Sequence, residues 1–200
     1  MQLTRIVLAF FALAAVGAQD FGSLKPIPNL NQGGLKYCPP STLLSILGKP
    51  CTLKADCSPV TNEKIKKLTI TGRVGHIGLT GIKPAVEAAI RALTKVQKEN
   101  PALFKVIKSA GMLCCRLIRN SKTEASNHSW GTAVDFSIND VLDPRGDGKA
   151  QLGLHTLYPY FHAEGFYWGA GFSGASEDAM HFEVADQTIR RWQQEGKLSA

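Results

Sequence analysis

The sequence lacks several features that would place it in a familiar class. After residue 16 it has no apolar run approaching the roughly 20 residues that a membrane-spanning helix needs. It has no dense block of lysine and arginine, so nucleic acid is not an expected partner. It has no internal repeat and no low-complexity tract, and neither of the two commonest zinc motifs, HExxH and CxxC, occurs. Any chemistry must therefore come from residues that are dispersed along the chain.

Residues 1–18 have the composition of a secretory signal peptide. The stretch MQLTRIVLAFFALAAVGA carries one arginine, an apolar run from Ile6 to Val16, and small residues before an expected cleavage after Ala18. The apolar run is too short to cross a bilayer comfortably. We therefore expect a secreted, extracellular monomer with no membrane segment. Cleavage would leave about 180 residues, which suits one domain with a sizeable core.

Basic residues outnumber acidic ones. The chain has 23 Lys and Arg against 16 Asp and Glu, a formal net charge of +7, and the signal peptide contains only one of these charges. A basic secreted protein is drawn towards anionic polymers such as bacterial cell walls. Because the lysines are spread over many segments, ordinary solubility explains the excess equally well.

Five cysteines in an exported chain indicate disulfides. Cys38, Cys51 and Cys57 lie in a proline-rich stretch, whereas Cys114 and Cys115 are adjacent in an apolar run. Neighbouring side chains of a strand point to opposite faces, so we expect one of this pair to bond to the 38–57 cluster and not to its neighbour. The odd count leaves at least one free thiol, and the core-like context MLCCRLI favours an inert cysteine over a nucleophile.

The hydrophobic pattern predicts an α+β domain with a mostly antiparallel sheet and flanking helices. Residues 19–71 form an irregular, cysteine-containing N-terminal segment, and residues 72–200 form the main domain. Apolar residues recur at helical spacing from Pro84 to Asn100, and a second helix is expected from Pro101 to Gly111. Strands are predicted at 112–119, 132–138, 166–172 and 179–184, with helices at 151–164 and 188–195.

A histidine and an aspartate flank the start of the strand predicted at 132–138. Alternation along this strand directs Val134 and Phe136 to the apolar face and Asp135 to the other face, next to small residues. His128 precedes the strand, and Gly131 allows a bend between them. A carboxylate held in a sheet is costly unless it is paired or bound to a metal, so Asp135 requires a cation or another partner.

A third candidate ligand, His181, lies on the strand predicted at 179–184. Two imidazoles and one carboxylate suffice for a catalytic zinc, which keeps its fourth position open. Asp178, three residues before His181, could take a proton from water, and Glu177 is a rival base. The alternative is that each residue is structural, since isolated histidines and strand aspartates often are.

Two motifs carry a family resemblance. SNHSWGTAVDF resembles the motif SxHxxGxAxD, and DAMHFE resembles [E/D]xxH, of the D-alanyl-D-alanine carboxypeptidase and L-alanyl-D-glutamate endopeptidase family. These zinc peptidases cut stem peptides of bacterial peptidoglycan and share their fold with the signalling domain of hedgehog-type proteins. The resemblance runs from about Gly72 to Trp192. It implies zinc held by His128, Asp135 and His181, with Asp178 as the catalytic base.

The same resemblance suggests substrate contacts. Arg116 matches an arginine that orients substrate and stabilises the oxyanion, although a surface salt bridge is the alternative. Ser126 matches the motif serine, and Trp130 or Trp168 could line the cleft, with a loop serine and ordinary packing as the alternatives. An aspartate at 178 resembles the L-Ala-D-Glu endopeptidases more than the D-Ala-D-Ala carboxypeptidases.

Two other classes of function are compatible with these motifs. One is a non-catalytic, secreted zinc-binding interaction module of the hedgehog-like type, and the other is a disulfide-stapled domain without a metal. The base and the arginine are both present, which favours an enzyme acting on peptidoglycan or its muropeptides.

Overall fold

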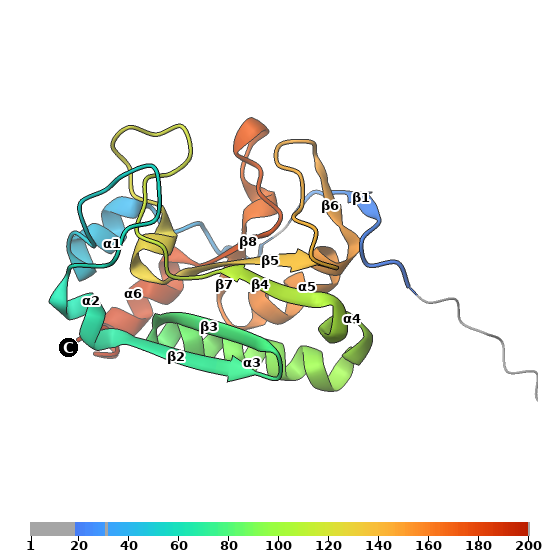
Figure 1. Ribbon diagram of the computed structural model, residues 1–200, viewed down its shortest axis with the longest axis horizontal. Helices are drawn as coiled ribbons and strands as arrows, with labels where there is room; N and C mark the ends of the chain where they lie inside the picture. Colours follow the sequence, from blue (N-terminus) through green and yellow to red (C-terminus); the bar gives the residue numbers. More distant parts are fainter. Residues whose placement is uncertain (1–18, 31, 200) are drawn as a thin grey trace, which may run out of the picture.

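A four-stranded antiparallel sheet forms the centre of the molecule. The computed structural model describes residues 19–30 and 32–199, and the predicted signal peptide lies outside them. The strand order is β4 (Ile107–Gly111), β5 (Ala133–Ile138), β8 (His181–Val184) and β7 (Phe166–Trp168), with every neighbouring pair antiparallel (Figure 1). The predicted α+β class with an antiparallel sheet is confirmed. Within the described ranges no helix is long and apolar enough to cross a bilayer.

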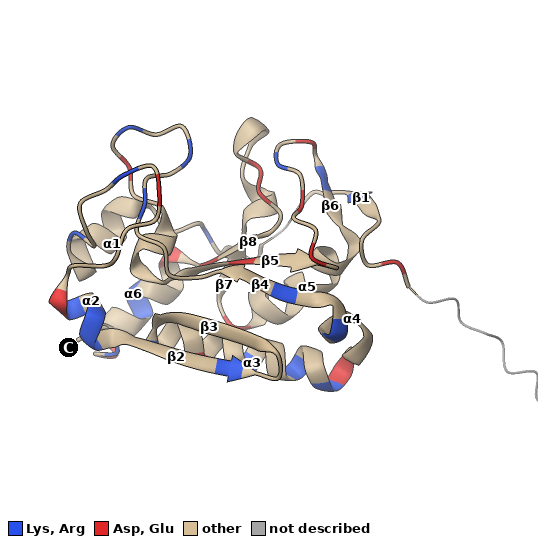
Figure 2. Cartoon of the chain, in the orientation of Figure 1, with Lys and Arg blue, Asp and Glu red and all other residues tan. Residues whose placement is uncertain are grey.

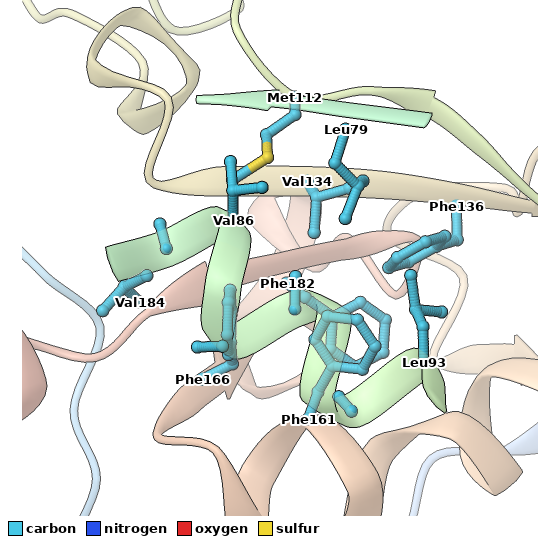
Figure 3. Packing of buried hydrophobic residues seen from close by; sticks show 14 of the residues in the cluster. Leu79, Val86, Leu93, Met112, Val134, Phe136, Phe161, Phe166, Phe182 and Val184 are labelled. Carbon is cyan, nitrogen blue, oxygen red and sulfur yellow. The ribbon is translucent and has the colours of Figure 1, made fainter. Parts of the chain in front are cut away.

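One face of this sheet packs on two helices. α3 (Lys83–Glu99) begins with Pro84 in its first turn, where the fixed φ of proline suits a helix start. Its buried stripe of alanine, valine and leucine meets α5 (Leu152–Ala163) and the sheet. Figure 3 shows the aromatic centre of this core, where Phe136 and Phe182 from the sheet pack on Phe161 from α5. The opposite face of the sheet is left to loops, and the polar side chains of β5 and β8 point there.

The N-terminal region and a hairpin complete the fold. Residues 19–71, predicted to be irregular, contain β1 (Leu24–Pro26), α1 (Pro40–Leu47) and α2 (Glu63–Leu68). A hairpin of β2 (Thr69–Val74) and β3 (Ile77–Ile82) leads into α3, and β1 pairs with β6 (Lys149–Gln151). The chain ends with α6 (Asp186–Gln194), close to the helix predicted at 188–195. Lys and Arg are spread over many helices and loops (Figure 2).

The prediction for residues 101–119 is wrong in two respects. The helix α4 (Pro101–Val106) is shorter than expected, and Ile107–Gly111 continues as the edge strand β4. The strand expected at 112–119 is absent, and this stretch makes only isolated bridges, such as Leu117 to Ala125. The reason is Gly111, whose φ of 132° follows an irregularity in the pairing of β4 and turns the chain out of the sheet.

The strand expected at 166–172 ends early. β7 stops at Trp168, and Gly169–Gly171 is a 3-10 turn that folds back over β8. A Cβ atom at Gly169 would lie 2.5 Å from the carbonyl oxygen of Asp178 and 3.1 Å from Cβ of His181, so glycine permits this close approach. The turn thereby brings the Asp178 backbone against the sheet.

Two disulfides join the N-terminal region to residues 114 and 115. Cys51 bonds to Cys115 and Cys57 to Cys114, so both members of the adjacent pair bridge to the first cluster, where only one such bond was expected. Cys38 is free and buried. Burial, reinforced by the nearby carboxylates of Glu183 and Asp186, raises the pKa of the Cys38 thiol, which disfavours the reactive thiolate form.

Candidate metal centre

A tight turn at the entrance to β5 positions His128. The 3-10 turn Asn127–Trp130 is closed by Gly131 in the left-handed conformation, with a φ of 65°. A Cβ atom at Gly131 would lie 2.5 Å from Cα of Gly81 in β3, so the turn requires glycine. The Nδ1 of His128 lies 2.8 Å from the Met112 carbonyl oxygen, which can only accept, so Nδ1 donates. In the neutral ring, Nε2 then carries the lone pair.

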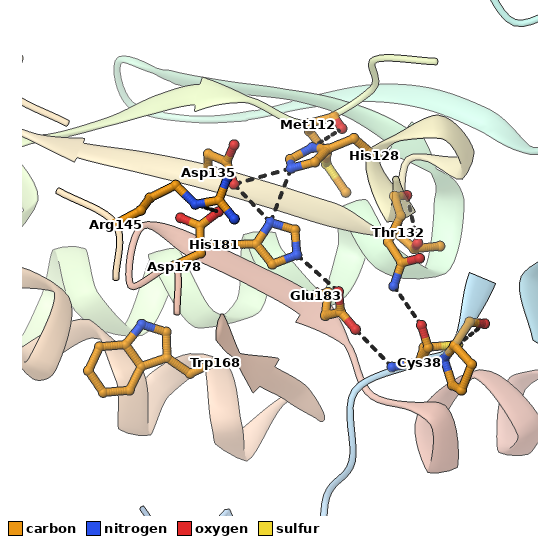
Figure 4. A network of polar contacts seen from close by, with 12 residues as sticks. Cys38, Met112, His128, Thr132, Asp135, Arg145, Trp168, Asp178, His181 and Glu183 are labelled. Atoms are coloured by element: carbon orange, nitrogen blue, oxygen red, sulfur yellow. Dashed lines mark hydrogen bonds and ion pairs between the residues drawn. The ribbon is translucent and has the colours of Figure 1, made fainter. Parts of the chain in front are cut away.

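The register of the sheet places the other two candidate ligands together. Asp135 on β5 is paired directly with His181 on β8, on the face opposite the aromatic core. Asp135 Oδ1 lies 3.0 Å from His181 Nδ1 and 3.1 Å from His128 Nε2, and the two nitrogens are 3.2 Å apart. Figure 4 shows the three side chains converging on one point.

A glutamate orients His181. The Nε2 of His181 lies 3.0 Å from Oε2 of Glu183, two residues further along the same strand face. Because a carboxylate accepts, Nε2 donates, and the lone pair of the neutral ring is on Nδ1. Each candidate histidine ligand therefore has its outward nitrogen held by a hydrogen-bond acceptor, the arrangement found around ligating histidines.

The resulting donor set fits a zinc ion. With both rings neutral, two imidazole lone pairs and one carboxylate oxygen face each other, an arrangement that repels unless a proton or a metal cation lies among them. Zinc bonds of about 2.0–2.1 Å in a tetrahedron would separate neighbouring ligand atoms by about 3.3 Å, close to the distances found here. Three protein ligands also leave one coordination position open, which distinguishes catalytic from structural zinc.

The electrostatics of the set are those of a cation site. Burial alone would raise the pKa of Asp135, but His128 and His181 hold it well below its usual range. Burial alone would lower the pKa of His181, but the hydrogen bonds to Asp135 and Glu183 raise it to about 10. Without a metal, a proton on His181 supplies the positive charge that balances the Asp135 carboxylate. A bound metal would replace that proton.

Asp178 lies beside this set with one oxygen free. Its Oδ2 is 3.1 Å from Nε of Arg145, whereas Oδ1 is buried without a hydrogen-bond partner. Burial raises the pKa of Asp178 and the charge of Asp135 adds to the effect, while His181 and Arg145 oppose it. A carboxylate with a raised pKa and an unused oxygen is suited to accept a proton. Glu177 is buried instead against the backbone N–H of Gly148.

A cleft of about 510 Å³ opens over the site. His128, His181 and Asp178 line it, and so do Arg116 and Ser126, as expected for substrate-contacting residues. Trp168 is not in the lining: it is 1% exposed, donates from Nε1 to the Ala179 carbonyl oxygen at 2.6 Å, and stacks on core aromatics. Trp130 is also buried, with its Nε1 bonded to the Gly48 carbonyl oxygen. The structure thus brings together all the predicted site residues except the tryptophans.

The sequence did not single out Glu183, Arg145 or Cys38, which all lie at the site. Glu183 could have been found, because strand alternation places it on the face of His181. Arg145 lies in a loop between β5 and β6 with no local pattern to mark it. Cys38 contributes through its backbone, about which a side-chain motif carries no information.

A buried acid close to the site gives a pH-dependent prediction. Asp143 is 3% exposed, accepts from the Gln151 N–H at 2.6 Å, and has its second oxygen buried without a partner. Burial, with Glu177 and Asp147 nearby, raises the pKa of Asp143 to about 7. The folded state therefore binds this proton more tightly than the unfolded state, so its contribution to stability falls as the pH rises from about 4 to 7.

Asp143→Asn should therefore stabilise the protein most at high pH. Since one pKa unit corresponds to about 1.4 kcal/mol, we expect a gain above about 1 kcal/mol in the free energy of unfolding at pH 8, shrinking towards pH 5. Urea denaturation at both pH values measures it, with the exposed Asp56→Asn, which is not among the groups that shift the pKa of Asp143, as the control. If the free energies of unfolding of Asp143→Asn and the wild type differ by the same amount at both pH values, the raised pKa of Asp143 is contradicted.

Two histidines and an aspartate around one point, with a second carboxylate beside them and a cleft above, form a candidate site for a single metal ion. Residues 119–184 match the model of a family described as D-alanyl-D-alanine carboxypeptidase. This segment contains the three candidate ligands and Asp178 and is similar to that family, as the two motifs predicted. The match is shorter than the expected resemblance, and Arg116 precedes it. A search of curated proteins gave no significant match.

Proposed function

We propose that the protein is a secreted zinc peptidase that hydrolyses amide bonds in the stem peptides of bacterial peptidoglycan. The observation that carries the proposal is the convergence of His128, Asp135 and His181 beside the unused oxygen of Asp178, in a segment of the carboxypeptidase family. The two disulfides are compatible with an extracellular location.

Zinc and the side chains of the protein have different roles in the proposed chemistry. Bound zinc supplies a Lewis acid that polarises the scissile carbonyl and lowers the pKa of water. Asp178 accepts the proton of the attacking water through Oδ1 and delivers it to the leaving amine. Arg145, 3.1 Å from the other oxygen, holds the carboxylate in place and keeps its charge balanced.

The cleft offers guanidinium groups to a carboxylate of the substrate. Arg116, Arg119 and Arg145 line it, together with the carboxylates of Glu124, Asp178 and Glu183. Peptidoglycan stem peptides carry free carboxylates, which planar guanidinium groups bind in a bidentate manner. Ser126, also in the lining, is proposed as a further substrate contact.

Arg116 is proposed to stabilise the developing oxyanion. One of its guanidinium nitrogens donates to the Leu117 carbonyl oxygen at 3.1 Å, which fixes the group while its other N–H bonds remain available. Arg116→Lys should lower kcat by about 10²–10³-fold, the usual cost of one oxyanion donor, because lysine lacks the planar fork. Steady-state kinetics check this, with the exposed Arg73→Lys as the control. A raised KM with normal kcat would instead make Arg116 a carboxylate clamp.

The proposed bond is the one between L-alanine and D-glutamate. The basis is the aspartate at position 178, which resembles the endopeptidase members of the family, whereas the description of the matching model names the carboxypeptidases. Digestion of purified peptidoglycan followed by mass spectrometry distinguishes them. We expect new amino termini on D-glutamate, released more slowly at high ionic strength because the protein is basic.

The other outcomes of this digest are equally informative. Free D-alanine as the sole product would make the protein a carboxypeptidase. An absence of products from every wall type, by protein that contains zinc, would favour the non-catalytic zinc-binding interaction module.

A further inference from the structure

A short N-terminal segment, residues 32–40, runs beside the sheet and reaches the metal centre; we call it the strap. Gln32 bonds through its side chain to both the N–H and the carbonyl of Trp168 in the edge strand β7, at 2.9 and 3.0 Å. Further along, the Lys36 N–H donates to Gln187 and the Lys36 carbonyl accepts from the Asp186 N–H, both at 3.0 Å. The strap is thus fixed to β7 and to the start of α6. It lies far outside the family match at 119–184.

The peptide groups of Cys38 connect the strap to both histidine ligands. The Cys38 N–H donates to Oε1 of Glu183 at 2.8 Å, and the other oxygen of Glu183 accepts from Nε2 of His181 at 3.0 Å. The Cys38 carbonyl accepts from Nδ2 of Asn127 at 2.8 Å, and Asn127 immediately precedes His128. Figure 4 shows this continuous chain of hydrogen bonds from Cys38 through Glu183 to His181.

This geometry makes the Cys38 N–H necessary for Glu183. The Glu183 side chain is 5% exposed, so each of its oxygens needs a protein donor. Without the Cys38 N–H, one oxygen of a buried carboxylate would lose its partner, which is costly and allows the group to rotate. The Cys38 thiol has no comparable role, because its polar contacts are 3.9 Å long.

We propose that the strap is a positioning element of the zinc site, which acts through the Cys38 N–H on Glu183 and thereby fixes the orientation of His181. The inference rests on the proposed zinc binding and not on which bond is cut. It adds to the family domain a part of the site that is contributed by the N-terminal region.

A matched pair of variants isolates the backbone N–H. Cys38→Ala removes the thiol and keeps the N–H, whereas Cys38→Pro removes both. Cys38 already precedes Pro39, which keeps its backbone in the extended range that proline also adopts, so the fixed φ of the new ring is the main added constraint. In competition with a chromophoric chelator, Cys38→Ala should bind zinc like the wild type. Cys38→Pro should bind about 10–100-fold more weakly, the usual cost of losing an outer partner of a metal ligand.

A double-mutant cycle separates positioning from general damage. In a Glu183→Ala background, Cys38→Pro should cost little further zinc affinity, since the carboxylate through which the N–H acts is gone. A local distortion caused by proline would cost the same in both backgrounds. Equal zinc affinity of Cys38→Pro and Cys38→Ala would overturn the inference and leave the zinc peptidase standing, whereas a wild type that binds no zinc would refute the proposed function itself.

Hydrogen exchange in the full chain provides a test that does not depend on the proline variant folding. In the zinc-loaded wild type the Cys38 amide should be protected. Glu183→Ala should remove that protection while the Lys36 amide, bonded to Gln187, keeps its own. Unchanged protection at Cys38, or equal loss at both amides, would contradict the proposed link.

Discussion

Asp178→Asn is expected to bind zinc and fold like the wild type while lowering kcat on a stem peptide by about 10²–10⁴-fold, the usual contribution of a general base. Asparagine keeps the size of the side chain but cannot accept the proton. The unused Oδ1, buried without a partner beside the candidate ligands, is the atom whose chemistry is lost. Steady-state kinetics on a muropeptide and zinc content by elemental analysis measure the two halves of this prediction.

Glu177→Gln is the matched control for this variant. Glu177 is the neighbouring carboxylate, is buried, and does not line the cleft, so its replacement should leave turnover near that of the wild type. Near-normal activity of Asp178→Asn together with a large loss in Glu177→Gln would transfer the role of the base to Glu177. Loss of zinc in Asp178→Asn would make Asp178 a part of the metal site.

The second large effect is expected from the ligands themselves. His128→Ala, Asp135→Ala and His181→Ala should each weaken zinc binding by more than the roughly 10–100-fold that loss of an outer partner costs. The two remaining ligands are too few to hold zinc tightly, and alanine supplies no ligand atom in place of the one removed. Activity should fall with the metal. Competition with a chromophoric chelator measures the affinity of each variant.

His155→Gln controls for the loss of a histidine elsewhere. His155 lies on α5 outside the cleft, where its Nε2 is 3.3 Å from the Lys25 carbonyl oxygen, so its replacement should leave zinc affinity unchanged. An Asp135→Ala variant that holds zinc as tightly as the wild type would exclude the carboxylate from the ligand set.

The sequence predicted the site better than the sheet that carries it. Alternation in β5 correctly directed Phe136 to the core and Asp135 away from it, and the two motifs identified three groups that do converge. What local patterns could not supply is the register. The pairing of Asp135 with His181 joins residues 46 positions apart, and a shift of one residue would have separated them.

The errors in the fold have local physical causes. The strand β4 contains Lys108 and Ser109 and therefore lacks the apolar alternation that marks a half-buried strand. The apolar run MLCCRLI resembles a strand, yet it follows the turn at Gly111, and its cysteines are bonded to Cys51 and Cys57 outside the sheet. Periodicity alone cannot report such a crosslink.

Sequence patterns could not predict the role of the strap, for a different reason. Cys38 acts through its N–H and carbonyl, which every residue other than proline possesses, on a glutamate 145 positions away. A cysteine at this position directs attention to its thiol, which is the part of the residue that the site does not use.

The most direct test of the account is the cleavage of a defined muropeptide by protein that has been stripped of metal and then reloaded with one equivalent of zinc. Mass spectrometry should show two fragments whose masses sum to that of the substrate plus one water, formed by the reloaded protein and not by the stripped protein. Intact substrate after incubation with the reloaded protein, or equal cleavage by the stripped protein, would contradict the proposal that this chain is a zinc peptidase.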